Sequence, residues 1–434
     1  MPLRPRNVAV LIILVITLFL WFKHSRPSSV SSLHYLVKSS KTSTDILNAT
    51  LGFQSIFTIN LPSRTDRRDA MTLAAALSGL DITWIDGVAS TDVPDKVLPG
   101  GDTTMKGGNR GSWRAHMNAL QRIVEHNVTS ALILEDDADW DIRLKAQMQI
   151  FAHAARAFTQ PRHRRGGGDP LSSQYRDHPS PSVPITHLPS LPNPQLTPYG
   201  DAWDVLWLGH CGTSFPSGAP PNSINTAPAS PLRVAIPADP TVPAPQHLKP
   251  HPFALADPLA ELYPPHTRVV HLSNGTTCTQ AYAVSQRGAR KLLYRFGLAE
   301  RLTKGWDLVL GDWCDGAYRP SSVAGGDGDD DGEDGDGGGR GNGKGLPVCV
   351  TVQPPLFSHH YGAGGGGKSD ISAPGGGFLR VGEGRMGKGM TPYVRWSVRL
   401  NMGRLVEAGS GDVEGLVVDQ WGEREEGTLG RLGS

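Results

Sequence analysis

The chain has 434 residues, of which 38% are hydrophobic and 19% are charged, both below the usual shares of a compact globular protein. Glycine and proline contribute 52 and 35 residues, about a fifth of the chain, so part of its length is not expected to pack. The formal net charge of +1 argues against a nucleic-acid-binding protein, which usually has a basic surplus, and against a wholly acidic disordered chain.

The first feature along the chain is the uncharged apolar run VAVLIILVITLFLWF at 8–22. A membrane-spanning helix needs roughly 17–25 residues, but the flanking Arg6 and Lys23 can reach the interface of a thin bilayer. The alternatives are a cleaved signal peptide, which lacks the small residues expected after the run, and a buried core helix. We predict a cytosolic tail (1–7), a signal-anchor helix (8–22) and a stem (23–54).

This arrangement predicts a single-pass type II protein of the Golgi or endoplasmic reticulum membrane, with the remainder of the chain in the lumen. Three N-x-[ST] sequons support the lumenal placement; they begin at Asn48, Asn127 and Asn274. The four cysteines lack C-x-x-C spacing, which makes a structural zinc site unlikely. In an oxidising lumen they form up to two disulfides with three possible pairings, among Cys211, Cys278, Cys314 and Cys349.

Strand and helix patterns alternate from residue 55 to residue 357. A strand at 55–61 is followed by a helix-start signature at Ser63 and Asp66, and a second strand covers 81–88. The next helix is expected to open at Ser112, because apolar residues then recur on one helical face; they are Trp113, Met117, Leu120 and Val124. Further strands are expected at 131–137, 203–210, 278–285 and from 348, with a helix at 288–296. This alternation predicts an α/β fold with a mainly parallel sheet.

Three segments rich in proline, serine, glycine or aspartate interrupt these patterns, at about 163–199, 212–265 and 325–345. We expect them to be long disordered insertions within a domain at 55–371, which a C-terminal extension at 372–434 follows. The acidic glycine run at 325–345 contains pieces of a calcium loop. However, it lacks the glutamate at the twelfth position and the flanking helices, so a solvated linker is the favoured interpretation.

The strongest chemical signal is the buried strand that ends in three acids, LILEDD at 132–137. Buried carboxylates need partners, so these acids should emerge at the carboxyl edge of the sheet, where α/β folds bind ligands. Alternation places Glu135 and Asp137 on one face and Asp136 on the other. Two carboxylates on one face suit Mg²⁺ or Mn²⁺. The alternative is an acidic turn that only keeps the strand end soluble.

A basic loop follows the first strand, and it should lie at the same edge of the sheet. It contains Asn60, Arg64, Arg67 and Arg68 at the start of a helix. A helix amino terminus that carries arginines suits an anion such as a diphosphate.

Several segments, in order, resemble glycosyltransferase family 25, the lipooligosaccharide and collagen β-galactosyltransferase group. INLPSRTDRR at 59–68 is similar to the family's N-L-x-R-x-x-R-R, with one extra residue before the first arginine. GSWRAHMNAL at 111–120 has Ala115 before His116, where the family has serine before histidine. LILEDDA at 132–138 matches residue for residue, and TQAYAVSQRGARKL at 279–292 matches a later strand and helix. The aspartate-bearing WDLVL at 306–310 and the segments at 355–360 and 369–371 complete the resemblance.

The resemblance implies a GT-A-like fold with helices on both faces of the sheet, a UDP-sugar donor and bound Mn²⁺ (or Mg²⁺). Glu135 and Asp137 would bind the metal, and a histidine late in the sheet would complete its shell, either His359 or His360. A solvent-facing histidine pair is the alternative. Asp136 would contact the ribose or hold the loop.

Residues of the basic loop are expected to contact the nucleotide sugar, with Arg67 or Arg68 steadying the nucleotide, alongside Asn60 and Arg64. His116 points inward and is either a core histidine or a further contact to the donor. Inverting transfer needs a carboxylate base for the acceptor hydroxyl. The candidates are Asp307, which stands where the family has its aspartate, and Asp312; either could instead be a helix N-cap.

The sequence therefore predicts a metal-dependent glycosyltransferase (a hexosyltransferase) that moves a sugar, first of all galactose, from a UDP-sugar to a glycan or glycoprotein acceptor. A catalytically silent lumenal protein of the same fold, binding sugar or acting as a scaffold, is the alternative. A metal-dependent phosphohydrolase is a third interpretation.

Overall fold

The computed structural model describes residues 45–100, 105, 107–160, 182–216, 233–248, 258–318, 346–363, 389–408 and 415–422. The predicted tail and signal anchor, most of the stem, the acidic glycine run at 325–345 and the segment at 369–371 lie outside these residues. Among the helices of the described residues, none is both long and apolar enough to cross a membrane.

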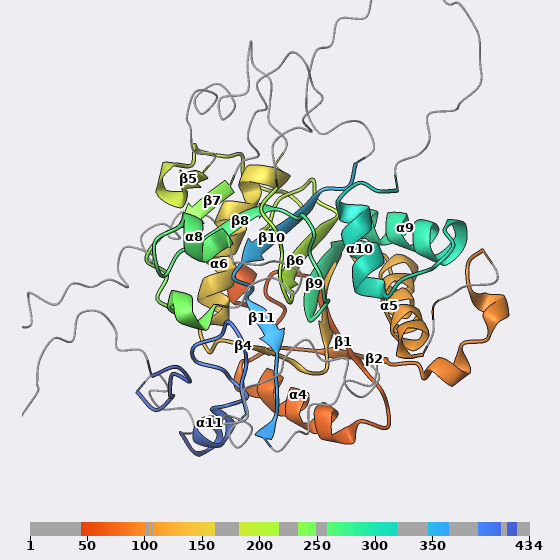
Figure 1. Ribbon diagram of the computed structural model, residues 1–434, viewed down its shortest axis with the longest axis horizontal. Helices are drawn as coiled ribbons and strands as arrows, with labels where there is room; N and C mark the ends of the chain where they lie inside the picture. Colours follow the sequence, from red (N-terminus) through yellow and green to blue (C-terminus); the bar gives the residue numbers. More distant parts are fainter. Residues whose placement is uncertain are drawn as a thin grey trace, which may run out of the picture.

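An 11-stranded sheet forms the centre of the fold (Figure 1). Its main path has the order β2-β1-β3-β9-β6-β10-β8-β7-β5. The strands of the path are β1 (Ser55–Asn60), β2 (Thr83–Asp86), β3 (Ser130–Glu135), β5 (Ser182–Pro184), β6 (Val205–Gly209), β7 (Arg233–Ile236), β8 (Arg268–Leu272), β9 (Ala281–Ser285) and β10 (Cys349–Gln353). Two short strands lie off this path: β11 (Phe357–His359) pairs with β6 and with β4 (Ala138–Trp140).

The sheet is mixed rather than mainly parallel in its pairing. Strands β8 and β9 run against the other strands of the main path, and β9 pairs antiparallel with both β3 and β6. The prediction missed this because β9 is buried on both faces and therefore has the same apolar pattern as a parallel strand. The reversal brings the amino end of β9 to the carboxyl ends of β3 and β6.

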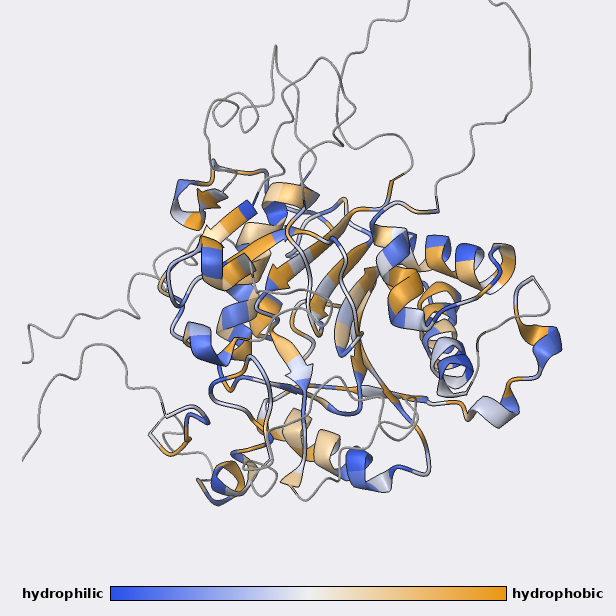
Figure 2. Cartoon of the chain, in the orientation of Figure 1, coloured by the Kyte–Doolittle hydropathy of each residue, from blue (hydrophilic) through white to orange (hydrophobic). Residues whose placement is uncertain are grey.

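Helices cover both faces of the sheet, as expected. The helices α4 (Thr65–Leu77) and α6 (Leu144–Thr159) pack into one core, and α5 (Gly108–Glu125), α9 (Gln286–Tyr294) and α10 (Trp306–Cys314) into the other. Strand β3 serves both cores, because Leu132 and Leu134 face the first while Ala131 and Ile133 face the second. Figure 2 shows the hydrophobic residues along the central strands. The α/β class is confirmed, whereas the GT-A-like character stays a prediction.

Shorter helices complete the described fold. They are α8 (Pro258–Leu262), α11 (Met402–Ala408), the one-turn helices η1 (Asp45–Leu47), η2 (Ser90–Asp92), η3 (Asp95–Val97), η4 (Ile185–His187) and η5 (Pro245–His247), and the π-helical turn η6 (Arg295–Ala299).

Two helices begin at other residues than predicted. Helix α4 begins at Thr65, after Arg64 rather than Ser63, and no side chain caps it. Helix α5 begins four residues before Ser112 and contains Gly111 in its first turns. A Cβ on Gly111 would lie 2.1 Å from the carbonyl oxygen of Val88, so close packing against the loop after β2 decides this helix start. A local capping pattern carries no information about such a contact.

Two of the expected disordered insertions contain ordered elements. Strand β5 lies within 163–199, and β7 lies within 212–265, where it pairs with β8 and with β5. Both strands are short and lie at one end of the sheet, where a proline such as Pro184 is tolerated. Their proline-rich surroundings hide them from a search for long apolar runs.

The segment at 389–408 packs against the domain that was predicted to end at residue 371. Val398 and Leu405 belong to the core that α4 and α6 line. Ser397 pairs with Asp141 in an isolated bridge, and its hydroxyl donates to the buried carboxylate of Asp139, as does the Thr391 hydroxyl at 2.6 Å. This segment is therefore part of the folded domain beside the β3–β4 turn.

The four cysteines form two disulfides, Cys211–Cys278 and Cys314–Cys349, which is one of the three pairings left open by the sequence. Cys211 lies two residues beyond the carboxyl end of β6, whereas Cys349 pairs in register with Val205, the first residue of β6. The two disulfides therefore lie at opposite ends of the parallel β6–β10 pair.

Candidate active site

The three acids of the LILEDD motif lie at the end of β3, beside the loop that joins β1 to α4. Strand β3 ends at Glu135, and Asp136 and Asp137 form the turn into β4. Because the chain leaves the strand geometry at this point, the predicted alternation of the three acids is wrong. Asp136 and Asp137 share one partner, Arg67 of α4, which donates to Asp136 Oδ1 at 2.7 Å and to Asp137 Oδ2 at 2.8 Å.

The Asp136 carboxylate is held by the basic loop. Asn60, the last residue of β1, donates from Nδ2 to Asp136 Oδ2 at 2.8 Å and to the carbonyl oxygen of Arg64 at 3.2 Å. Burial raises the pKa of Asp136, and the neighbouring Asp137 raises it further, whereas Arg67 and Asn60 oppose the shift. Asn60 and Arg67 therefore orient the acidic turn from the β1–α4 side.

Asp137 faces His359. His359 Nδ1 lies 3.3 Å from Asp137 Oδ2, the oxygen that also accepts from Arg67. Burial alone would raise the pKa of Asp137, but His359 and Arg67 overcome it and hold the pKa below its usual value. The other oxygen, Oδ1, is buried and has no hydrogen-bond partner among the described residues. Such an oxygen is costly to bury unless it receives a proton donor or a cation.

The structure distinguishes the two candidate histidines. Burial would lower the pKa of His359, but Asp137 raises it above its usual value, which favours an imidazolium opposite the carboxylate. His360 turns the other way: its Nδ1 lies 2.9 Å from the Thr391 hydroxyl and 3.6 Å from Asp139. Only the backbone N–H of His360 reaches Asp137, donating to its carbonyl oxygen. His359 is therefore the histidine of the site.

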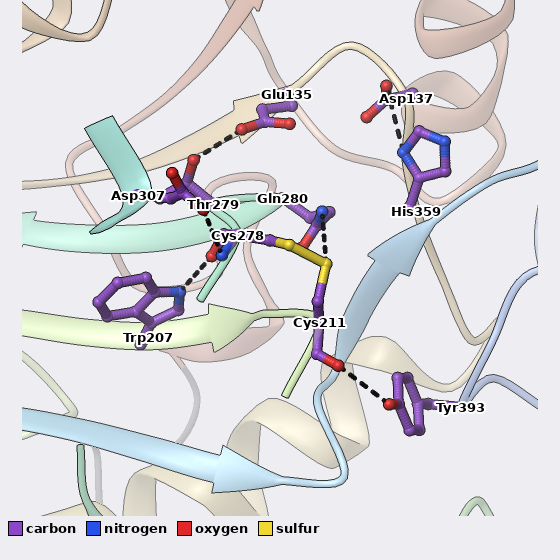
Figure 3. Close-up of a disulfide and its surroundings, with 10 residues drawn as sticks. All are labelled: Glu135, Asp137, Trp207, Cys211, Cys278, Thr279, Gln280, Asp307, His359 and Tyr393. Atoms are coloured by element: carbon purple, nitrogen blue, oxygen red, sulfur yellow. Dashed lines mark hydrogen bonds and ion pairs between the residues drawn. A yellow bond between two sulfur atoms is a disulfide. The ribbon is translucent and has the colours of Figure 1, made fainter. Parts of the chain in front are cut away.

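Glu135 points to a different group of residues (Figure 3). Its Oε1 accepts a hydrogen bond from the Thr279 hydroxyl at 2.7 Å, and His116 Nε2 lies 4.0 Å from the same oxygen. Burial, with a smaller contribution from Asp137, raises the pKa of Glu135 to about 8. Near neutral pH this carboxyl is therefore largely protonated in the structure as described.

The two candidate bases differ in position. Asp307 lies in the first turn of α10, where its Oδ2 accepts from the backbone N–H of Cys278 at 3.0 Å, next to Thr279. Asp307 is near enough to Glu135 to contribute to the raised pKa of that residue. Asp312 instead forms an exposed ion pair with Lys304 at 2.6 Å. Neither aspartate is the N-cap of α10, which is Gly305.

His116 matches the interpretation as a core histidine. It is buried, its Nδ1 lies 2.9 Å from the Tyr282 hydroxyl, and its ring stacks on Trp306 with centroids 5.4 Å apart. Burial lowers the pKa of His116 to about 3, so the ring is neutral at physiological pH. It packs beside Glu135 as an uncharged group.

The remaining arginines of the basic loop are held by local partners. Arg64 forms two hydrogen bonds with Asp66, at 2.9 Å from Nε and 2.8 Å from NH2. The guanidinium of Arg68 lies over the Trp84 ring at 4.4 Å from its centroid. Of the three predicted arginines, Arg67 is the one that pairs with the carboxylates of the acidic turn.

Sequence reasoning missed two residues of this region. Thr279 was visible only as part of the family-like pattern, which gave it no role. Arg399 was placed in the C-terminal extension, yet it donates from NH2 to the carbonyl oxygen of Asp136 at 2.7 Å and from Nε to that of Ala138 at 3.0 Å. Arg399 therefore supports the backbone of the acidic turn, whereas Arg67 binds its carboxylates.

The predicted metal ligands are not gathered as a set. Within the described ranges, no group of three or more His, Cys, Asp or Glu side chains is arranged to hold a metal ion. Figure 3 shows the Asp137 carboxylate facing His359, while Glu135 points toward Thr279.

Comparison with known proteins supports a relationship with glycosyltransferases over part of the chain. No protein-family profile matches it. The chain is 29% identical over 116 residues to procollagen galactosyltransferase 1-B of Xenopus laevis, covering 24% of this chain and 19% of that protein. It is 31% identical over 112 residues to procollagen galactosyltransferase 1 of Danio rerio, covering 23% and 18%. The matched stretch thus spans about a fifth of these relatives.

Proposed function

We propose that this protein is a metal-dependent galactosyltransferase that moves galactose from UDP-galactose to a glycan or glycoprotein acceptor, with inversion at the transferred sugar. The partial similarity to procollagen galactosyltransferases supports the reaction class. The observation that carries the proposal is the buried, unpartnered Oδ1 of Asp137 at the carboxyl end of β3. In α/β sheets this edge is where ligands bind, and the orphaned oxygen is suited to a cation.

The residues present fit a Mn²⁺ or Mg²⁺ ion in part. Asp137 offers a free oxygen, and Glu135 offers a carboxyl whose raised pKa a neighbouring cation would lower. His359 lies beside Asp137 and would have to lose its proton to serve as a ligand. Carboxylate and imidazole ligands together suit Mn²⁺. When bound, the ion would stabilise the charge that develops on the leaving diphosphate.

The donor is proposed to lie between the acidic turn and the start of α4. This helix has 13 residues, and a helix amino terminus suits a diphosphate. Arg67 and Asn60 hold Asp136 at this place, where its carboxylate could accept a ribose hydroxyl. Arg64 and Arg68 flank the same helix start, so either one could turn from its present partner to a phosphate.

Asp307 is the proposed base. The Cys278 N–H occupies Oδ2, which orients the carboxylate and leaves Oδ1 for the acceptor. The acceptor hydroxyl would pass its proton to Asp307 as its oxygen attacks the anomeric carbon, and the bond from that carbon to UDP would break on the opposite face. Asp312 is not favoured for this step because its carboxylate forms an ion pair with Lys304.

The proposed compartment is the lumen of the Golgi or the endoplasmic reticulum, with residues 8–22 as the anchor. The two disulfides support an oxidising compartment, because such bonds are rare in cytosolic proteins.

The test uses the full-length protein, solubilised in detergent, with MnCl₂, UDP-galactose and a panel of acceptors including hydroxylysine peptides. UDP release and product linkage are measured. Asp137→Asn, which preserves the shape of the side chain, should reduce kcat by at least about 100-fold, a typical loss when a major electrostatic contact is removed. The matched control is Asp312→Asn, an exposed carboxylate outside the site, which should stay within about twofold. Full activity of Asp137→Asn would refute the metal assignment.

One observation favours a second function, a catalytically silent sugar-binding or scaffold protein. Arg67 already bridges both carboxylates of the acidic turn, so part of their negative charge is offset without any added cation. Calorimetric titration with UDP separates the two functions, because the transferase should bind UDP more tightly with Mn²⁺ than without it. A phosphohydrolase would instead release inorganic phosphate from UDP.

A further inference from the structure

We propose that the Cys211–Cys278 disulfide is a positioning element of the candidate active site, and that its reduction disables the site while the fold persists. This inference rests on the proposed function, because it assigns the disulfide a role in holding the proposed base. The bond joins Cys211, just beyond the carboxyl end of β6, to Cys278, which precedes Thr279 and Gln280 in the loop that leads into β9. It therefore lies at the same sheet edge as Glu135 (Figure 3).

Cys278 and its neighbour Thr279 bind the side chains of Asp307 and Glu135. Its N–H donates to Asp307 Oδ2 at 3.0 Å, and its carbonyl oxygen accepts from Trp207 Nε1 at 2.9 Å. The next residue, Thr279, donates its hydroxyl to Glu135. The backbone of Cys278 has a φ of 63°, in the left-handed region that a non-glycine residue adopts only when its surroundings impose it. The disulfide is one covalent source of that constraint.

Cys211 contacts both the loop before β9 and the C-terminal segment 389–408. Its carbonyl oxygen accepts from the Tyr393 hydroxyl at 3.1 Å, and its N–H donates to the carbonyl oxygen of Thr277 at 3.0 Å. Tyr393 belongs to the same segment, 389–408, as Arg399, which holds the acidic turn. One bond thus connects the base and Thr279 to the segment that supports Asp136.

The second disulfide provides an internal comparison. Cys314–Cys349 joins the last residue of α10 to the first residue of β10, at the opposite end of the β6–β10 pair. The two bonds close loops of 67 and 35 residues. Because loop entropy grows slowly with length, they should stabilise the fold to similar degrees. Of the two, Cys211–Cys278 is the bond whose backbone donates a hydrogen bond to a proposed site residue, Asp307.

The chemical step is ordinary thiol–disulfide exchange with a dithiol reductant. A thiolate of the dithiol attacks one sulfur of the disulfide, and the other cysteine sulfur leaves and takes up a proton. The second thiol of the reductant then displaces the first cysteine, which also takes up a proton. Two electrons pass to the protein, two cysteine thiols form, and the reductant becomes a disulfide. Cys211 and Cys278 are each partly exposed, which leaves the bond open to attack.

The test compares two double variants of the full-length protein. Cys211→Ser with Cys278→Ser removes the bond at the site, and Cys314→Ser with Cys349→Ser removes the remote bond. We expect the first to lower kcat about 10- to 100-fold, as a misplaced base does, with KM for UDP-galactose changed less than about threefold. The second should keep kcat within about twofold. A purely structural role would lower the melting temperature of both alike and leave kcat of the folded protein unchanged.

Dithiothreitol extends the comparison. It should inactivate the variant that keeps only Cys211–Cys278 and leave the residual activity of the variant that keeps only Cys314–Cys349 unaffected. Equal sensitivity of the two variants would overturn the proposal, as would full kcat in the Cys211→Ser, Cys278→Ser variant.

Hydrogen exchange keeps this inference separate from the proposed function. Loss of the site disulfide should accelerate exchange in peptides covering 277–281 and 389–394, and loss of the remote disulfide should not. If the wild type transfers no sugar, the proposed function fails, yet the exchange result still tests the positioning. Unchanged exchange at both segments would overturn the positioning role whether or not the wild type is active.

Discussion

His271 should lower the stability of the fold in mild acid because it is buried as a neutral imidazole. His271 of β8 is buried, its Nδ1 lies 2.8 Å from the carbonyl oxygen of Leu272, and its ring packs against Phe215. Burial lowers its pKa from the ordinary 6.5 of histidine to about 3. The unfolded chain therefore binds a proton on this side chain at pH 5, whereas the folded protein does not.

The sign and the size of the effect follow from proton linkage. Stability rises with pH wherever the unfolded state binds more protons, so the contribution of His271 should fall as the pH drops below about 6.5 and level off near pH 3. Between about pH 7.5 and about pH 5 the loss from His271 is about 2 kcal/mol. His116, whose pKa burial also lowers to about 3, should add a similar amount.

Urea denaturation at the two pH values measures this loss. His271→Gln replaces the imidazole with an amide that does not titrate and can still donate to Leu272, so the difference between the two pH values should shrink by about 2 kcal/mol relative to the wild type. The matched control is His126→Gln at an exposed position, which should keep the wild-type difference. An unaltered pH dependence in His271→Gln would refute the reasoning.

Three further predictions concern the site and the surface. Thr279→Val removes the hydroxyl that donates to Glu135 and should lower kcat by about tenfold or more, whereas Thr279→Ser should retain activity, as steady-state kinetics would reveal. Arg399→Met leaves the carbonyl oxygens of Asp136 and Ala138 without their donor and should lower the melting temperature by several degrees, more than Arg404→Met at an exposed position. Expression in a secretory host should place an N-glycan on the exposed Asn48, and glycopeptide mapping that finds this asparagine unmodified there would count against its accessibility.

The sequence predicted the neighbourhood of the site better than its geometry. The buried run before Glu135 and the basic loop after β1 correctly predicted that acids and an arginine meet at one sheet edge, because parallel β1 and β3 pair directly. It did not predict that Asp136 and Asp137 share Arg67. That sharing depends on where β3 stops and the turn begins, which the alternation of apolar residues does not encode.

The C-terminal segment shows a different limit of sequence reasoning. Residues 389–408 have no long apolar run and follow a glycine-rich stretch, so they did not suggest a part of the domain. Their contribution consists of polar contacts, such as those of Thr391 and Ser397 with the buried Asp139. Partners of this kind are separated by about 250 residues in the chain and become visible only once the fold brings them together.

The reversed direction of β9 explains how one sheet edge can carry two distinct groups of functional side chains. If β9 ran parallel to β3, Thr279 and the disulfide at Cys278 would lie at the opposite edge, far from Glu135. Because β9 runs antiparallel, its amino end brings the Thr279 hydroxyl to Glu135 and the Cys278 N–H to Asp307, while Arg67 and His359 approach Asp137 from α4 and β11. The proposed base and the proposed cation ligands therefore lie around the carboxyl end of β3, which makes the end of that strand the place where donor and acceptor would meet.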